Sequence, residues 1–432
     1  MSLEKNFCPS PWFHIRINNL GTYEYCRWQT HSDKIRNNLQ QNISHLTPLN
    51  YIQQTVAPIR QQLLDGQSPK GCSDCKLMEQ HSKVSGRQRQ LLKAGIQEKY
   101  FAKSLASSPM RPAFDYSVAN HGETNRTVTD WQIDLGNYCN SACVFCKPEF
   151  SSRLATEFKQ LGLIDSVPPS SWCNDSELLQ KFIDDLVASP DLVYLHFIGG
   201  ETTITPAFKT ILAALIQAGL HQKVNLGFTT NLTVWPQDVI DLLVQFDWIH
   251  LGLSLETLTP INDYARWTSQ QQQTQELLDR WVALARTHDW LVQLRITPSC
   301  LTIHELHTVY DYAWQHHLTV ESCNFIGEPK YFRINVLPDE QRQQAYANLE
   351  SWVENHPIEN TQQIVNTRDP NIARKQMRQD AESYMSYLKS EPDESHRLPD
   401  LVAYLKLLEQ RRGNCILDYL PQYENIFRSA GY

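Results

Sequence analysis

Several features that mark whole classes of protein are missing from this sequence. It has no long basic run, and its 47 Asp and Glu residues outnumber its 39 Lys and Arg residues, which argues against nucleic acid or an anionic membrane as a partner. No apolar run approaches the roughly 18 residues that a membrane span needs, and the first residues lack the apolar core of a signal peptide. We therefore expect a cytoplasmic protein that binds neither nucleic acid nor membrane.

The composition that remains is that of a folded globular protein. The chain has 432 residues, of which 41% are hydrophobic and 20% are charged, so it is long enough for two or three domains. We expect four segments: a small β-rich module over 1–76, a helical connector over 77–128, a β/α region over 129–330 and a helical region over 331–432.

The β/α region contains six strand-like runs separated by helical patterns. This alternation predicts an α/β fold with a parallel, partly closed (β/α)6 barrel. Aromatic and β-branched residues on either side of "NNLG" predict a β-hairpin within 12–28, and the C-terminal region is predicted to be helical, most clearly over 398–412. The six runs are 130–136, 192–200, 223–230, 248–256, 291–297 and 318–326.

The eleven cysteines are unevenly distributed. An odd number in a reducing compartment argues against a disulfide framework, and clustered thiols indicate metal ligands or catalytic groups. Two clusters stand out, and four cysteines lie apart from them. The first cluster is Cys8, Cys26, Cys72 and Cys75, the second is Cys139, Cys143 and Cys146, and the separate residues are Cys173, Cys300, Cys323 and Cys415.

The second cluster is the run "CNSACVFC", from Cys139 to Cys146. It follows a predicted strand, and active sites of parallel barrels lie at the carboxyl ends of the strands. Thiolates select iron–sulfur clusters, zinc or copper(I), and zinc normally takes four ligands, whereas no fourth cysteine or histidine is near. Three thiolates on a [4Fe–4S] cluster leave one iron open to a substrate or cofactor.

This Cys-x₃-Cys-x₂-Cys spacing resembles the radical S-adenosylmethionine (radical SAM) superfamily, which usually has an aromatic residue where Phe145 stands. The resemblance implies that SAM is the missing ligand of the [4Fe–4S] cluster. It also implies that an electron from a flavodoxin- or ferredoxin-type donor cleaves SAM to a 5′-deoxyadenosyl radical, which removes a hydrogen from the substrate.

Later segments of the β/α region carry the same resemblance. The second strand ends in "FIGGE", which matches the superfamily's GGE motif except that Thr202 replaces the usual proline. By resemblance, this segment holds the SAM ammonium group, and an arginine in "YARWT" pairs with a carboxylate. The residues expected to bind the cofactor are Gly199, Gly200, Glu201, Asn231, Ser254 and Arg266.

The N-terminal cysteines have two readings. Four cysteines with one C-x₂-C pair suffice for structural zinc. However, "CPSPW", "GTYEYC" and "GCSDC" resemble the SPASM and twitch modules of radical SAM proteins. That resemblance implies a second [4Fe–4S] cluster held by Cys8, Cys26, Cys72 and Cys75, which saturate it, so it would serve electron transfer or structure.

Auxiliary modules of this kind suggest a peptide substrate. The arrangement resembles maturases of ribosomally made peptides, in particular proteusin-type epimerases, and implies a precursor peptide with a leader. Epimerisation needs a hydrogen donor, and we expect Cys323 or Cys415, ahead of Cys300 and Cys173. Alternatives are a maturase that forms cyclophane or thioether cross-links, an enzyme acting on a sugar or other small molecule, and a non-catalytic metal-binding scaffold.

Two hypotheses concern the leader. The net charge of −8 favours a basic leader, and the edge of the N-terminal hairpin offers a pairing site for an extended one.

Overall fold

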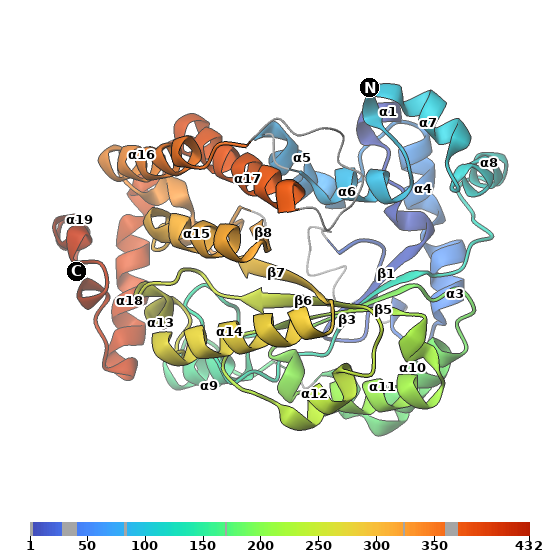
Figure 1. The fold of residues 1–432 in the computed structure, drawn as a ribbon, viewed down its shortest axis with the longest axis horizontal. Coiled ribbons are helices and arrows are strands. Elements are labelled where there is room, and N and C mark those ends of the chain that lie inside the picture. The colour runs from blue at the N-terminus through green and yellow to red at the C-terminus, as the bar shows by residue number, and fades with distance from the viewer. Residues whose placement is uncertain (1–2, 28–40, 82–83, 169–170, 323–324, 359–369) are drawn as a thin grey trace.

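The predicted parallel barrel forms. The computed structural model describes residues 3–27, 41–81, 84–168, 171–322, 325–358 and 370–432. Within them, one eight-stranded sheet has the order β2-β1-β3-β4-β5-β6-β7-β8, and all pairs from β1–β3 to β7–β8 are parallel (Figure 1). The α/β fold class is therefore confirmed. The six predicted strands are β3 (Asp130–Asp134), β4 (Tyr194–Ile198), β5 (Asn225–Thr230), β6 (Ile249–Ser254), β7 (Leu291–Ile296) and β8 (Thr319–Ser322).

Side chains alternate along these strands between two different environments. The outward positions are apolar and join the main core beneath the surrounding helices, as Trp131, Phe197 and Phe228 do. A parallel sheet covered on both faces usually carries apolar side chains on both. Here the inward positions are polar, so the barrel interior is suited to bind a polar group: they include Asp130, Gln132, Tyr194, His196, His250, Gln293, Arg295 and Glu321.

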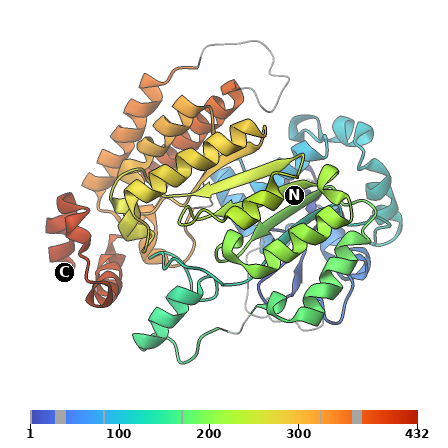
Figure 2. The ribbon, with the colours of Figure 1, turned by 60° about the horizontal axis from the view of Figure 1, so that its bottom comes forward.

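Helices cover the outer face of the strands, and Figure 2 brings several of them forward. They lie in the connections that return the chain from one strand to the start of the next. They are α9 (Ser152–Gln160), α10 (Ser176–Val187), α11 (Pro206–Gln217), α12 (Gln237–Leu243), α13 (Ile261–Ala265), α14 (Gln271–Thr287) and α15 (Leu306–His316).

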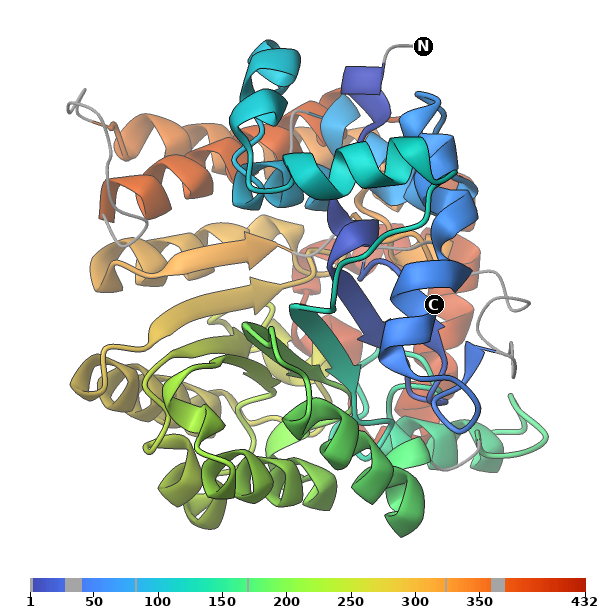
Figure 3. The same cartoon turned by 90° about the vertical axis from the view of Figure 1, so that its right-hand side faces the viewer.

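The predicted N-terminal hairpin also forms, and it extends the barrel sheet. Its strands β1 (His14–Ile17) and β2 (Tyr23–Glu24) are antiparallel, and β1 also pairs in parallel with β3 (Figure 3). The outer strands are β2 and β8, so the sheet is open between them. The helices before β3 are α1 (Leu3–Asn6), α3 (Pro48–Asn50), α4 (Ala57–Leu64), α5 (Ser73–Gln80), α6 (Gly86–Lys93), α7 (Phe101–Ser107) and α8 (Arg111–Ala119).

The C-terminal region is helical, as predicted. Its helices are α16 (Asp339–Asn355), α17 (Pro370–Ser390), α18 (Leu398–Arg412) and α19 (Glu424–Ser429). Helix α17 packs against both α16 and β8, the last strand of the sheet. None of the helices in the described ranges is both long and apolar enough to cross a membrane.

One buried arginine holds the N-terminal elements together. Arg60 of α4 is fully buried and donates hydrogen bonds to four main-chain carbonyls. The acceptors come from three segments that are distant in sequence: Pro11, Ile52, Gln53 and Gly122.

We expect Arg60→Met to lower the free energy of unfolding by on the order of 3 kcal/mol, because buried carbonyls would lose their donors. Urea unfolding followed by tryptophan fluorescence measures this. The matched control is Arg111→Met, which removes an exposed arginine whose partner is Asp115 one turn away. Equal stability of the two variants would contradict a structural role for Arg60.

Candidate functional site

The cysteine run lies at the carboxyl end of β3, where the sequence places it. Its backbone is fixed by pairing with the segment that follows α13. The amide of Ala142 donates to the carbonyl of Trp267 at 2.5 Å, and the amide of Val144 donates to that of Ala265 at 2.9 Å. The run "YARWT" is therefore the direct backbone support of the cysteine loop.

Helix α18 of the C-terminal region also contacts the cysteine loop. The Arg412 guanidinium donates to the carbonyl of Ala142 at 2.8 Å and pairs with Glu157 of α9 at 2.6 Å. The Arg412 side chain is 2% exposed and also lies over the Trp267 ring. The Tyr404 hydroxyl donates to the carbonyl of Val144 at 2.9 Å. The sequence carried no signal for Arg412 or Tyr404, because both lie in an ordinary helical pattern.

Of the three cysteines in the loop, Cys143 is buried and the other two are half-buried. Burial raises the pKa of Cys139 to about 12, with a further contribution from Cys143, and burial also raises the pKa values of Cys143 and Cys146. Thiols of this kind stay protonated near neutral pH unless a strong positive charge, such as that of a metal centre, lies beside them.

The GGE segment packs directly against the chain that leads into the cysteine loop. The amide of Gly200 donates to the carbonyl of Gly136 at 2.7 Å, and the amide of Glu201 donates to that of Tyr138 at 2.8 Å. A Cβ atom on Gly200 would lie 2.3 Å from the Tyr138 carbonyl oxygen. Gly199 has φ +139°, a conformation that favours glycine. The two glycines are thus needed for the contact between the two loops.

The Glu201 carboxylate is 1% exposed, and both of its oxygens accept hydrogen bonds from the chain. One oxygen accepts from the amide and hydroxyl of Thr203, and the other accepts from the amide of Asn231 at 2.6 Å. Burial raises the pKa of Glu201, an effect that these hydrogen bonds oppose. Glu201 therefore joins the ends of β4 and β5, and its expected role towards SAM stays a prediction.

Asn231 connects the end of β5 to the cysteine loop. Its side-chain amide donates to Asn140 at 2.9 Å and to Ser141 at 3.0 Å, and lies 4.0 Å from the Cys139 sulfur. Ser254 ends β6 at the same edge of the sheet. Phe145 is half-buried against the main core.

Arg266 lies close enough to the cysteine loop to interact electrostatically with Cys143 and Cys139. It pairs at 2.8 Å with Glu256, which follows β6 and was not anticipated from the sequence. Burial raises the pKa of the Glu256 carboxyl, an effect that the guanidinium opposes. The other Glu256 oxygen accepts from the amide of Thr297 after β7, so this pair also joins the end of β7 to the site.

The four N-terminal cysteines converge as well, at the other end of the sheet. Cys8 precedes β1, and Cys26 follows the antiparallel β2, so both lie near the amino ends of the parallel strands. Together with Cys72 and Cys75 they line one small pocket. Burial and the neighbouring thiols raise the pKa of Cys8.

Both cysteine sets offer donors that suit an iron–sulfur cluster, three thiols at one end of the sheet and four at the other. Across the described ranges, no group of three or more His, Cys, Asp or Glu side chains is already arranged to hold a metal ion.

The candidate hydrogen donors lie in different surroundings. Cys323 falls outside the described residues. The Cys415 sulfur lies 3.1 Å from the Tyr432 hydroxyl, which itself donates to Glu409, so the thiol is the donor to Tyr432. Glu409 also accepts from the hydroxyl of Tyr264, in the run "YARWT". By contrast, Cys300 and Cys173 are buried in the main core, with their thiols directed at main-chain carbonyls.

We expect Arg412→Leu to lower the free energy of unfolding by about 3 kcal/mol, since it leaves the buried Glu157 unpaired, and to lower the iron retained by the cysteine loop. Urea unfolding and iron analysis after gel filtration measure both effects. Arg411→Leu removes the exposed neighbouring arginine and is the matched control. Unchanged stability together with unchanged iron in Arg412→Leu would refute the role of Arg412 in supporting the cysteine loop.

Comparison with known proteins gives one family match and distant structural likenesses. Residues 133–312 match the model of the Radical SAM superfamily. No curated protein matches the chain. SuiB of Streptococcus suis bound to the precursor peptide SuiA has 13% identity over 68% of this chain and 62% of that chain, with a TM-score of 0.38.

Two further solved structures show likenesses of the same order. A second structure of SuiB, whose description names no bound molecule, has 14% identity over 52% of this chain and 46% of that chain, with a TM-score of 0.33. Native anSMEcpe with bound AdoMet has 16% identity over 52% of this chain and 60% of that chain, with a TM-score of 0.38. This chain thus spans less than two thirds of the matched chain in each of these three structures.

The matched residues contain the parallel strands β4 to β7, the cysteine loop at the end of β3 and the GGE segment at the end of β4. Proteins of this superfamily bind SAM and a [4Fe–4S] cluster. Over residues 133–312, this chain is thus similar to the radical SAM superfamily.

Proposed function

We propose that this protein modifies a ribosomally made precursor peptide, and that the modification is L-to-D epimerisation. The observation that supports a peptide substrate is the polar interior of the barrel, which lies between the two cysteine sets at opposite ends of the sheet. Strands of five or six residues put about 17–20 Å between those ends, and an extended chain can follow that length.

The chain's own residues position the reacting groups. The cysteine loop would hold the SAM-binding cluster, supported by the run "YARWT" and by Arg412, and the Cys8, Cys26, Cys72 and Cys75 pocket would hold an auxiliary cluster. When bound, SAM and its cluster supply the radical that removes a hydrogen atom. The loops after β4, β5 and β6 would hold SAM against the cysteine loop.

Epimerisation requires one hydrogen atom to leave the α-carbon and another to arrive on the opposite face. We propose a cysteine thiol as the second donor, Cys415 or Cys323. Cys415 is half-exposed and linked through Tyr432 and Glu409 to the element beside the cysteine loop. After donation, the sulfur radical needs one electron and one proton from an external reductant, and the auxiliary cluster offers a route for the electron.

The test is co-expression with a candidate precursor peptide in heavy water, followed by mass spectrometry. Epimerisation with an exchangeable thiol predicts a gain of about one mass unit per modified residue, carried as deuterium on the α-carbon. Cys415→Ala or Cys323→Ala should abolish that gain, whereas Cys173→Ala, a buried control, should preserve it. A loss of about two mass units would indicate cross-linking instead, and an unchanged peptide would contradict a peptide substrate.

Iron analysis tests the two proposed clusters independently of substrate. Anaerobically purified protein should contain about eight irons per chain, and the double variant Cys72→Ala, Cys75→Ala about four. Cys173→Ala should retain the wild-type content. A wild-type value near four, with zinc present, would mean that the N-terminal pocket holds zinc.

A further inference from the structure

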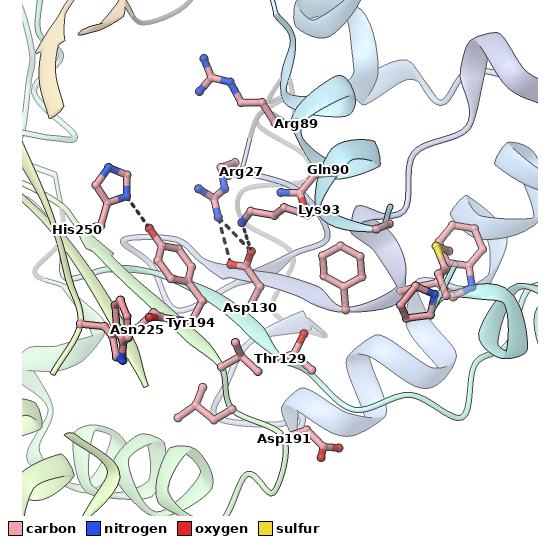
Figure 4. A pocket seen from close by; sticks show the side chains of 18 of the residues that line it. Arg27, Arg89, Gln90, Lys93, Thr129, Asp130, Asp191, Tyr194, Asn225 and His250 are labelled. Atoms are coloured by element: carbon pink, nitrogen blue, oxygen red, sulfur yellow. Dashed lines mark hydrogen bonds and ion pairs between the residues drawn. The ribbon is translucent and has the colours of Figure 1, made fainter. Parts of the chain in front are cut away.

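A large cavity lies at the amino ends of the barrel strands, far from the cysteine loop. Its volume is about 1150 Å³. It is lined by the first residues of β3 to β7, such as Asp130, Tyr194 and Asn225, and by Arg89, Gln90 and Lys93 of α6 (Figure 4). It also reaches Arg27 after β2 and Glu321 of β8, so it spans the opening between the two outer strands of the sheet.

The charge of this cavity is opposite to that of the whole protein. Its described lining has five cationic side chains and three carboxylates, in a chain of net charge −8. The pKa of His250 is lowered to about 4, chiefly by burial, so this side chain is neutral at physiological pH. The cations are Arg27, Arg89, Lys93, Arg126 and Arg295, and the carboxylates are Asp130, Asp191 and Glu321.

Two of these carboxylates are each shared by two cations. Asp130 accepts from Arg27 at 3.1 Å and from Lys93 at 3.2 Å, and both contacts are drawn in Figure 4. Glu321 pairs with Arg89 and, at 3.6 Å, with Arg295. Burial alone would raise the pKa of Glu321, but Arg89 and Arg295 lower it to about 2. Arg27, His14 and Lys93 likewise lower the pKa of Asp130 against the effect of burial, so both carboxylates are ionised. Cations still outnumber carboxylates in the described lining.

The rim of the cavity is apolar. Val193, Trp248 and Leu291 line it and are among the most exposed large hydrophobic side chains of the described protein, between 39% and 51% exposed. A cationic interior beside an apolar rim matches a chain segment that carries carboxylates next to hydrophobic residues.

We propose that this cavity is an anchoring site for an acidic segment of the substrate peptide, bound through Arg27, Arg89, Lys93 and Arg295. The inference rests on the proposed function, since it takes the substrate to be a peptide. The distance between this cavity and the cysteine loop favours a peptide over a small molecule. Asp130 stands nine positions before Cys139, and β3 alone spans about 17 Å.

An extended peptide covers about 3.3–3.6 Å per residue, so the acidic anchor lies at least roughly five residues from the residue that is modified. A small molecule held in this cavity would remain too far from the cysteine loop to react there. The overall negative charge of the chain suggested a basic leader, whereas this site selects an acidic segment.

The test uses fluorescein-labelled hexaglutamate, with hexaglutamine as its neutral match, and the full-length protein without SAM or reductant. Fluorescence anisotropy at low salt should show hexaglutamate binding about tenfold more tightly than hexaglutamine, with the difference falling as salt is added. Lys93→Gln and Arg89→Gln should each weaken hexaglutamate binding by about fivefold. Lys103→Gln removes an exposed charge outside the cavity and should change it by less than about twofold.

Equal binding of the two peptides, or equal affinities of Lys93→Gln and Lys103→Gln, would overturn the anchor. Displacement of hexaglutamate by pyrophosphate at lower concentration than by unlabelled hexaglutamate would assign the cavity to a small phosphorylated ligand and would also overturn it. A precursor modified normally by Lys93→Gln, with unchanged KM, would reject the anchor alone and leave the proposed function standing.

Discussion

The arrangement of the cysteine loop at the carboxyl ends of the strands depends on one buried ion pair, between Arg412 and Glu157. Both side chains are nearly inaccessible to solvent, and a buried pair of this kind is costly unless its hydrogen bonds are completed. Here the guanidinium also holds the carbonyl of Ala142 and lies over Trp267. The pair thereby links the C-terminal helix α18, the first barrel helix α9 and the cysteine loop.

Further polar contacts extend this support around the carboxyl end of the sheet. Glu201 joins the ends of β4 and β5, and the Arg266–Glu256 pair joins β6 to the residue after β7. Each contact ties a loop to its neighbour rather than to a distant part of the fold. The loops that would surround SAM are therefore positioned by one another, and the strands set only their spacing.

The length of the barrel strands separates the cysteine loop from the second set of cysteines and from the cationic cavity. The three thiols proposed to hold a SAM-binding cluster lie at the carboxyl ends of the strands, whereas four other thiols and a cationic cavity lie at the amino ends. Helix α6 lies beside both features of the amino end, because Gln90 lines the cysteine pocket and the cationic cavity. An electron-transfer centre and a substrate anchor would thus share one helix, opposite the site of hydrogen removal.

The sequence alone determined the six barrel strands, the hairpin and the three-cysteine loop, because alternating hydrophobicity and cysteine spacing are local properties. It also predicted which cysteines could act together. The tertiary structure decided the rest: that Arg412 and Tyr404 reach the loop from more than 250 residues away in sequence, and that Glu256 pairs with Arg266. It also decided that the inward charges form a cationic cavity in an acidic chain, since local charge depends on which strand ends meet and not on composition.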